Sequence, residues 1–316
     1  MKILLCGATD EQFARLRSMF LEVKFESSDD YDLVSGEVDA DALVAWSRGA
    51  LDAAFSPEMI VNCRSLRWVH APGAGVDDYM RWGLPDAHFE FTCGKIIQGV
   101  EVADHAVALL LTLTRSLHYA IKGVAFSDIP RPVELRGKTA VVIGMGGIGL
   151  CVAERLNAFG MTVHGVMENE IPYVNFVDKR FLADQLLDAL PLADAVIVAA
   201  PWTNQSENML DEAAFRAMKD DAFLVNVSRG GLINTDSLTK VVGEGHLRAV
   251  ALDVTNPEPL ADDHPLRSFD NVVITPHLAG ISDNLRGRIF DLVSTNIRRF
   301  STGQPLINVV DRLKGY

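Results

Sequence analysis

The hydrophobic positions of this 316-residue chain form short apolar runs that alternate with longer amphipathic stretches. A short apolar run bounded by Gly, Pro or Asp is typical of a buried strand, whereas an apolar face recurring every three to four residues predicts a helix. Strands that alternate with helices in this way build parallel sheets, so we predict the α/β fold class. The predicted strands cover residues 2–6, 42–45, 68–70, 139–143, 162–166, 195–199, 223–227, 250–254 and 272–275.

Two segments between these runs stand apart from the amphipathic pattern. Residues 102–117 are apolar on nearly every side, which predicts a buried helix. Residues 122–136 lack periodicity and contain Gly123, Pro130 and Pro132, which predicts a linker. The amphipathic stretches predict further helices at 11–20, 57–62 and 281–300.

Charge and composition narrow the choice of partners. The chain has 29 Lys and Arg against 42 Asp and Glu, a formal net charge of −13, which argues against binding nucleic acid or an anionic membrane surface by bulk electrostatics. No apolar run reaches the roughly 18 residues of a membrane span, and the first apolar run is too short for a signal peptide, so we expect a soluble cytoplasmic protein. The four cysteines are scattered without a CxxC pair, so neither a metal site nor a disulfide framework is expected.

A glycine pattern directly follows the apolar run 139–143 and precedes a helical pattern. In G-x-G-x-x-G the first glycine permits a tight turn, the second lets the backbone approach a pyrophosphate, and the third allows close packing of helix on strand. The helix N-terminus adds N–H donors and partial positive charge, which favours dinucleotide binding over the alternative, a glycine-rich turn without a ligand. The pattern consists of Gly144, Met145, Gly146, Gly147, Ile148 and Gly149.

The same fingerprint expects an acidic residue about 20 positions further on, where it holds the adenosine ribose. Glu168 follows the next predicted strand and takes this role in our prediction, while Met167 stands where the acid is first expected. No Lys or Arg follows before Lys179, which favours NAD over NADP and leaves NADP open. The alternative is that Glu168 is a solvated loop charge.

Chemistry-bearing residues follow three successive strands in the second half of the chain. Arg229, Asp253 and His277 each lie at or just after the end of one such strand, and Glu258 lies in the proline-rich loop between two of them. Ligands of an open α/β sheet bind outside the carboxyl ends of the strands, so we expect these residues to converge on one crevice. The simpler alternatives are a structural ion pair for Arg229, capping of the following loop for Asp253, and solvated loop positions for His277 and Glu258.

Six segments of the chain, among them those that carry these residues, resemble the corresponding segments of the D-isomer-specific 2-hydroxyacid dehydrogenases. The resemblance, together with the pattern above, predicts two Rossmann-like domains with parallel sheets. Residues 101–281 would form the dinucleotide-binding domain, and 1–100 with 282–316 a discontinuous substrate domain. The family's quaternary structure further implies a homodimer. The segments that carry the resemblance are 71–77, 102–109, 135–149, 224–230, 252–260 and 275–280.

The resemblance implies three catalytic roles. Arg229 would hold the substrate carboxylate and polarise its keto oxygen, His277 would be the acid/base, and Glu258 would pair with it. Histidine suits this role because it exchanges a proton near neutral pH, and a neighbouring carboxylate fixes its tautomer. Arginine offers a bidentate, permanently charged fork for a carboxylate.

The resemblance also implies binding residues. Gly75 and Val76 would form the backbone nest for the substrate carboxylate. Trp46-Ser-Arg48 follows a predicted strand of the substrate domain, and we hypothesise that Arg48 binds an acidic substrate group; the alternative is a solvated surface arginine. Asp253 would contact the nicotinamide carboxamide. Further cofactor contacts are expected at Pro201, Val227 and Gly280.

The expected activity is NAD(P)-dependent interconversion of a small 2-oxo acid and its D-2-hydroxy acid, with glyoxylate, hydroxypyruvate or a phosphorylated relative as substrate. Two other functions stay open. Phosphite dehydrogenases share this fold, whereas Glu258 argues against a formate enzyme, in which glutamine usually partners the histidine. Some relatives are corepressors that use the fold as an NAD-responsive binding module, which the presence of all three catalytic residues disfavours.

Overall fold

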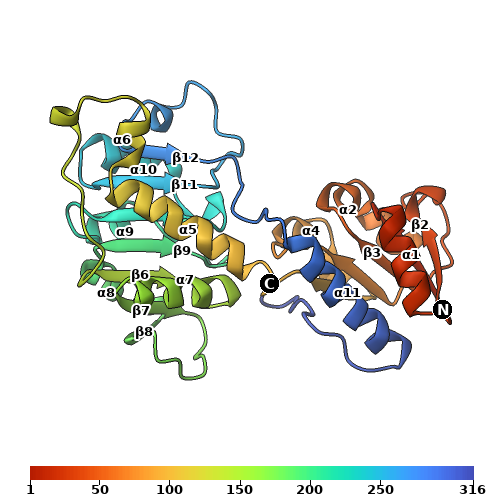
Figure 1. Ribbon diagram of the computed structural model, residues 1–316. Coiled ribbons are helices and arrows are strands. Elements are labelled where there is room, and N and C mark those ends of the chain that lie inside the picture. The colour runs from red at the N-terminus through yellow and green to blue at the C-terminus, as the bar shows by residue number, and fades with distance from the viewer. The chain divides into compact units, whose positions relative to one another are not determined.

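Two all-parallel sheets organise the chain, of which the computed structural model describes all residues, 1–316 (Figure 1). Each sheet belongs to its own compact unit: Met1–Gln98 with Asp283–Tyr316 form one, and Gly99–Ser282 form the other. The predicted α/β class with parallel sheets is confirmed. The assignment of cofactor binding to one unit and substrate binding to the other stays a prediction.

The sheet of the first unit buries both of its faces. In β1, Ile3 and Leu5 pack on one side and Leu4 on the other, because successive side chains of a strand point to opposite faces. In spatial order the strands are β2 (Lys24–Ser27), β1 (Lys2–Cys6), β3 (Ala42–Ala45), β4 (Trp68–Ala71) and β5 (Glu90–Cys93). One face is covered by α1 (Asp10–Met19) and α11 (Leu285–Ser301), and the other by α2 (Arg48–Ala54), α3 (Pro57–Asn62) and α4 (Asp77–Arg81).

The sheet of the second unit has seven strands, and their order reverses once. The chain starts in the middle of the sheet, adds two strands to one side, and then returns to add four to the other. The reversal point therefore lies between the first and fourth strands of this unit, as in dinucleotide-binding folds. In spatial order the strands are β8 (Lys179–Leu182), β7 (Thr162–Met167), β6 (Thr139–Ile143), β9 (Ala195–Val198), β10 (Phe223–Asn226), β11 (Ala249–Leu252) and β12 (Val272–Ile274).

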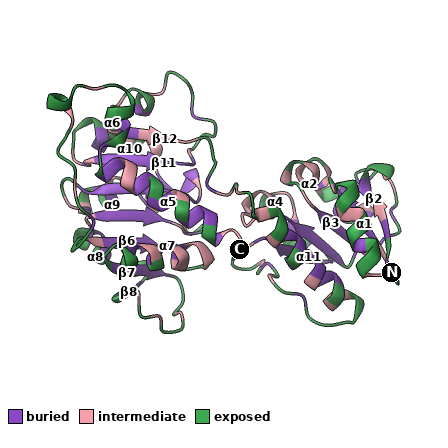
Figure 2. Ribbon diagram, viewed as in Figure 1, coloured by how far each residue is buried: buried purple, intermediate pink, exposed green.

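Helices cover both faces of this second sheet, whose interior strands are almost wholly buried (Figure 2). The helix predicted at 102–117 is α5 (Gly99–Thr114), and its side chains join one core layer together with those of α7 (Gly147–Ala158). A short helix, α6 (Leu117–Ile121), follows α5. The opposite face is covered by α8 (Leu186–Ala189), α9 (Glu212–Ala217) and α10 (Thr235–Gly243). None of the helices is both long and apolar enough to cross a membrane.

All nine predicted strands are present, but three more strands were missed. The missed strands are β2, β5 and β8, and each lies at an outer edge of its sheet. The helix predicted at 281–300 begins four residues later, at Leu285. Interior strands, buried on both faces, therefore carried a clearer hydrophobic signal than edge strands.

Candidate active site

The turn between β6 and α7 has the geometry that a pyrophosphate requires. Gly144 has a φ of +94°, and a Cβ built on it would lie 2.5 Å from Cα of Ala200. A Cβ on Gly149 would lie 1.8 Å from the carbonyl oxygen of Gly144, so α7 packs too closely on the turn for any side chain. At Gly146 a Cβ would meet nothing within 4 Å, which leaves open space where α7 begins. A pyrophosphate fits this space, because the N–H groups of a helix N-terminus favour an anion.

This turn lies at the carboxyl end of β6, beside the reversal point of the sheet, where open α/β folds bind their ligands. The other predicted cofactor residues differ in their exposure. Pro201 is exposed just after β9, and Gly280 and Ile148 are half-buried. Met145 and Val227 are buried with their side chains in the core, so only their backbone atoms are available to a ligand. Gly147 is the first residue of α7.

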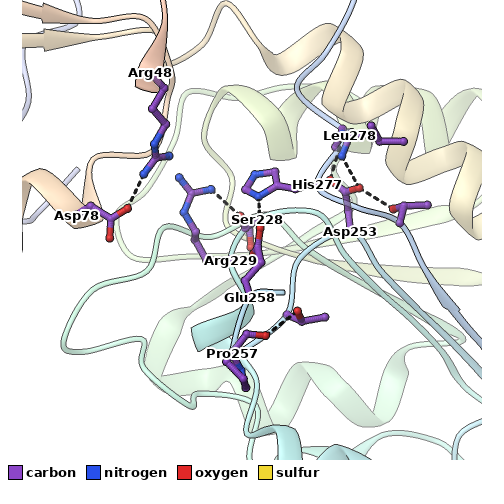
Figure 3. Close-up of polar contacts among 12 residues, drawn as sticks. Arg48, Asp78, Ser228, Arg229, Asp253, Pro257, Glu258, His277 and Leu278 are labelled. Atoms are coloured by element: carbon purple, nitrogen blue, oxygen red, sulfur yellow. Dashed lines mark hydrogen bonds and ion pairs between the residues drawn. The ribbon is translucent and has the colours of Figure 1, made fainter. Parts of the chain in front are cut away.

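His277 and Glu258 form a close, solvent-accessible pair (Figure 3). Nδ1 of His277 lies 2.6 Å from Oε1 of Glu258, and the two side chains are 43% and 41% exposed. Because an ionised carboxylate only accepts hydrogen bonds, Nδ1 donates to Glu258, and Nε2 is the ring nitrogen outside this contact. His277 has a φ of +55°, a left-handed conformation that residues with a side chain seldom adopt.

Arg229 follows β10 on a turn that a buried asparagine shapes. Asn226 is fully buried, and its Nδ2 donates to the carbonyl oxygen of Arg229 at 2.9 Å. Its Oδ1 accepts from the backbone N–H and the hydroxyl of Ser228, both at 3.1 Å. Nη1 of Arg229 donates in turn to the carbonyl oxygen of Ser228 at 2.8 Å. These bonds fix the backbone on which the guanidinium is carried.

The turn of Arg229 lies directly against the loop that carries Glu258. A Cβ on Gly230 would lie 2.0 Å from the carbonyl oxygen of Thr255, so only glycine permits this approach. In Figure 3 the side chains of Arg229, Glu258 and His277 gather beyond the ends of the strands. The structure thus brings together three of the four side chains that the sequence predicted to converge, and the fourth residue, Asp253, binds the backbone of His277.

Asp253 is bound to the loop that follows it. Its carboxylate is only 1% exposed and accepts from the hydroxyl of Thr275 at 2.6 Å and from the N–H groups of Leu278 and Ala279, both at 2.9 Å. Burial raises the pKa of Asp253, but hydrogen bonds from His105, Thr275 and the two N–H groups outweigh this effect and lower the pKa to about 2. In this structure Asp253 caps the loop that follows it, which was the simpler alternative. A contact with the nicotinamide carboxamide stays a prediction.

Comparison with known proteins gives a family match within the second unit, Gly99–Ser282. Residues 107–279 match the family model described as the D-isomer specific 2-hydroxyacid dehydrogenase, NAD binding domain. The matched range covers more than half of the chain and includes the glycine turn, Arg229, Glu258 and His277. The chain belongs to this family. It is an NAD(P)-dependent D-2-hydroxyacid dehydrogenase.

Relatives of the dehydrogenase carry more than one substrate name. It is 34% identical to the glyoxylate reductase of Thermofilum pendens, over 82% of this chain and 78% of that protein. It is 29% identical to the D-3-phosphoglycerate dehydrogenase of Archaeoglobus fulgidus, over 98% of this chain but only 59% of the length of that relative. Its fold matches that of a D-isomer specific 2-hydroxyacid dehydrogenase from Xanthobacter autotrophicus Py2 in complex with NADPH and MES, with a TM-score of 0.82, 22% identity, and coverage of 100% and 99% of the two chains.

At the predicted ribose end of the site, exposed acids follow β7 and cations lie on the neighbouring strand β8. Met167 ends β7 with its side chain in the core, and Glu168 is the first exposed residue after it. The missed strand β8 pairs with β7 and brings Arg180 opposite Gly165. The guanidinium of Arg180 donates to the carbonyl oxygens of residues 171 and 172, at 2.9 and 3.3 Å.

In the first unit, Gly75 and Val76 follow β4, and Arg48 begins α2. Val76 is buried, so its backbone is the part that a ligand could reach, and Gly75 is half-buried. Arg48 is half-buried and forms two ion pairs. Its Nη2 lies 2.5 Å from Oδ2 of Asp78, and its Nε lies 3.3 Å from Oδ2 of Asp52. Two carboxylates therefore already neutralise this guanidinium.

Sequence reasoning missed the buried and half-buried polar residues that support the site. Asn226, Thr275 and His105 were not predicted, although Asn226 and Thr275 flank predicted strand ends. A polar residue next to a buried strand was the available signal, because a buried polar group needs a hydrogen-bond partner. No group of three or more His, Cys, Asp or Glu side chains in residues 1–316 could hold a metal ion.

Proposed function

We propose that the dehydrogenase interconverts a small 2-oxo acid and its D-2-hydroxy acid, with His277 as the acid/base, Glu258 as its partner, and Arg229 as the ligand of the substrate carboxylate and carbonyl oxygen. The observation that carries this proposal is the 2.6 Å contact between Nδ1 of His277 and Oε1 of Glu258, beside the turn of Arg229. A bound nicotinamide supplies or accepts the hydride in this chemistry.

The pairing with Glu258 allows His277 to accept a proton in one direction of the reaction and to donate a proton in the other. With Nδ1 held as a donor, neutral His277 has a lone pair on Nε2 and accepts the hydroxyl proton during oxidation. Protonated His277 donates from Nε2 to the carbonyl oxygen during reduction, when negative charge develops there. Ionised Glu258 stabilises the protonated ring, and Arg229 neutralises the substrate carboxylate.

We propose NAD as the preferred cofactor. An exposed carboxylate at Glu168 suits ribose hydroxyls and repels a 2′-phosphate. Arg180, a cation on the neighbouring strand β8, already donates hydrogen bonds to two backbone carbonyl oxygens, which disfavours its use for a 2′-phosphate. NADP is the alternative, which the NADPH complex of the Xanthobacter autotrophicus relative keeps open.

We propose a small, unphosphorylated substrate such as glyoxylate or hydroxypyruvate. The relatives named above include both glyoxylate reductase and D-3-phosphoglycerate dehydrogenase. Arg48, the cation predicted to receive an acidic substrate group, is occupied by Asp52 and Asp78, which disfavours a second anionic group on the substrate. The family resemblance adds a homodimer to this proposal, and light scattering of the purified protein would test it.

The test is turnover with NADH and NADPH against a panel of 2-oxo acids, including glyoxylate, hydroxypyruvate, oxaloacetate and 3-phosphohydroxypyruvate. The proposal expects turnover by the wild type and a rate at least about 100-fold lower in His277→Ala. Nicotinamide binding without turnover of any 2-oxo acid would instead favour the binding-module alternative.

A further inference from the structure

A network of buried and half-buried polar groups holds the loop of His277. Asp253 binds this loop four times: its carboxylate accepts from Thr275, Leu278 and Ala279, and its backbone oxygen accepts from the N–H of His277 at 2.9 Å. The left-handed backbone of His277, with a φ of +55°, is less stable than ordinary conformations. The bonds to Asp253 therefore maintain a loop shape that the chain would not adopt by itself.

The network extends to helix α5 through His105. Nε2 of His105 lies 3.2 Å from Oγ1 of Thr275 and 3.2 Å from Oδ1 of Asp253. Thr275 gives its own hydroxyl hydrogen to Asp253, so its oxygen can only accept from His105. Nε2 of His105 therefore carries a hydrogen and donates to both oxygens. His105 lies 170 positions from Thr275 in sequence.

We propose that His105 is a positioning residue for catalysis: by donating from Nε2 to Asp253 and Thr275, it holds the 275–279 loop so that Nδ1 of His277 stays on Glu258. This inference rests on the proposed role of His277. His105 acts through the loop and does not itself exchange a proton with substrate. Its loss leaves Asp253 with one donor fewer and Thr275 without its second partner.

Two substitutions separate the hydrogen bond from the space that the ring fills. His105→Leu keeps much of the side-chain volume and removes the donor, whereas His105→Gln retains an N–H donor at similar reach. Asp104→Asn is the matched control, because the neighbouring Asp104 forms an exposed ion pair with Arg155 at 2.7 Å and does not contact the His277 loop.

The first readout needs no substrate. Hydrogen exchange of the apoprotein is expected to be at least about tenfold faster at the amides of Leu278 and Ala279 in His105→Leu, and close to wild type in His105→Gln and Asp104→Asn. The amides of β10 serve as the internal reference. Unchanged exchange of the 275–281 segment in His105→Leu would overturn the inference.

The second readout is kinetic, with NADH and glyoxylate as probes. His105→Leu is expected to lower kcat roughly 10- to 100-fold, with KM and NADH affinity within about twofold of wild type and rescue of kcat by His105→Gln. A wild-type kcat in His105→Leu, when His277→Ala is inactive, would overturn this inference alone. If His277→Ala kept the wild-type rate, the proposed function itself would fail, whatever the exchange data show.

Discussion

The buried histidine of the first sheet predicts how the dehydrogenase loses stability in acid. His70 in β4 is fully buried, its Nδ1 lies 2.8 Å from Oγ1 of Thr92, and its Nε2 has no hydrogen-bond partner. Burial lowers the pKa of His70 from 6.5 to about 3. Between these values the unfolded chain binds the proton and the folded chain does not. Folding stability is therefore complete above about pH 6.5 and falls as the pH is lowered toward 3.

The magnitude follows from the difference between the two pKa values. A difference of about 3.5 corresponds to a maximum loss of about 5 kcal/mol in the free energy of unfolding, reached near pH 3. At about pH 5, protonation of the unfolded chain alone removes about 2 kcal/mol. This is a large share of the roughly 5–15 kcal/mol by which a typical domain is stable.

The perturbation is His70→Asn, which removes the titrating ring and keeps a polar group near Thr92. Urea unfolding followed by tryptophan fluorescence is a suitable assay, because three of the four tryptophans, Trp46, Trp68 and Trp82, lie in this unit. Between about pH 7 and pH 5 the wild type is expected to lose about 2 kcal/mol more than the variant. The control is His88→Asn, which changes an exposed histidine of the same unit. Equal pH dependence in wild type and His70→Asn would refute the reasoning.

Three further predictions concern the proposed site. Gly149→Ala is expected to lower the melting temperature, because its Cβ would meet a backbone oxygen. Gly146→Ala is expected to melt like the wild type and to bind NADH at least about tenfold more weakly in a fluorescence titration. A lower melting temperature in Gly146→Ala with unchanged NADH affinity would contradict the cofactor assignment. Glu258→Gln is expected to lower kcat roughly 10- to 100-fold with NADH affinity unchanged, and steady-state kinetics at the wild-type rate would exclude its role. Asp78→Asn removes the closest charged partner of Arg48 and leaves this guanidinium more available to a second carboxylate on the substrate. The ratio of kcat/KM for oxaloacetate to that for glyoxylate should therefore rise several-fold. An unchanged ratio would contradict the proposal that Asp78 keeps Arg48 from binding a second anionic group.

The hydrophobic pattern located the interior strands of both sheets and failed at three of their four edge strands. Strands such as β3 and β9 are buried at every position, so their apolar runs are continuous. In the edge strand β8 only Phe181 is buried, and Lys179 and Leu182 are exposed. An edge strand pairs on one side only and therefore needs fewer apolar residues. Its place depends on backbone hydrogen bonds, which leave little trace in composition.

The residues of the site divide in a similar way into those that the sequence predicts and those that only the folded structure identifies. Arg229 and His277 were found because parallel topology carries the ends of successive strands to one edge. The supporting contacts, from Asn226 to the backbone of Arg229 and from His105 to Asp253, join side chains whose pairing the sequence does not encode locally. The ion pairs of Arg48 were not predicted for the same reason, since one of its two carboxylate partners, Asp78, lies 30 positions away.

The most direct test of the central claim follows the hydride and the proton together. The wild type and His277→Ala would be incubated with hydroxypyruvate and NADH deuterated at the transferable position, after NADH binding by both proteins has been verified. The account predicts D-glycerate with deuterium at C2 from the wild type, and no detectable product from His277→Ala. L-glycerate, product without deuterium at C2, or equal product from both proteins would contradict it.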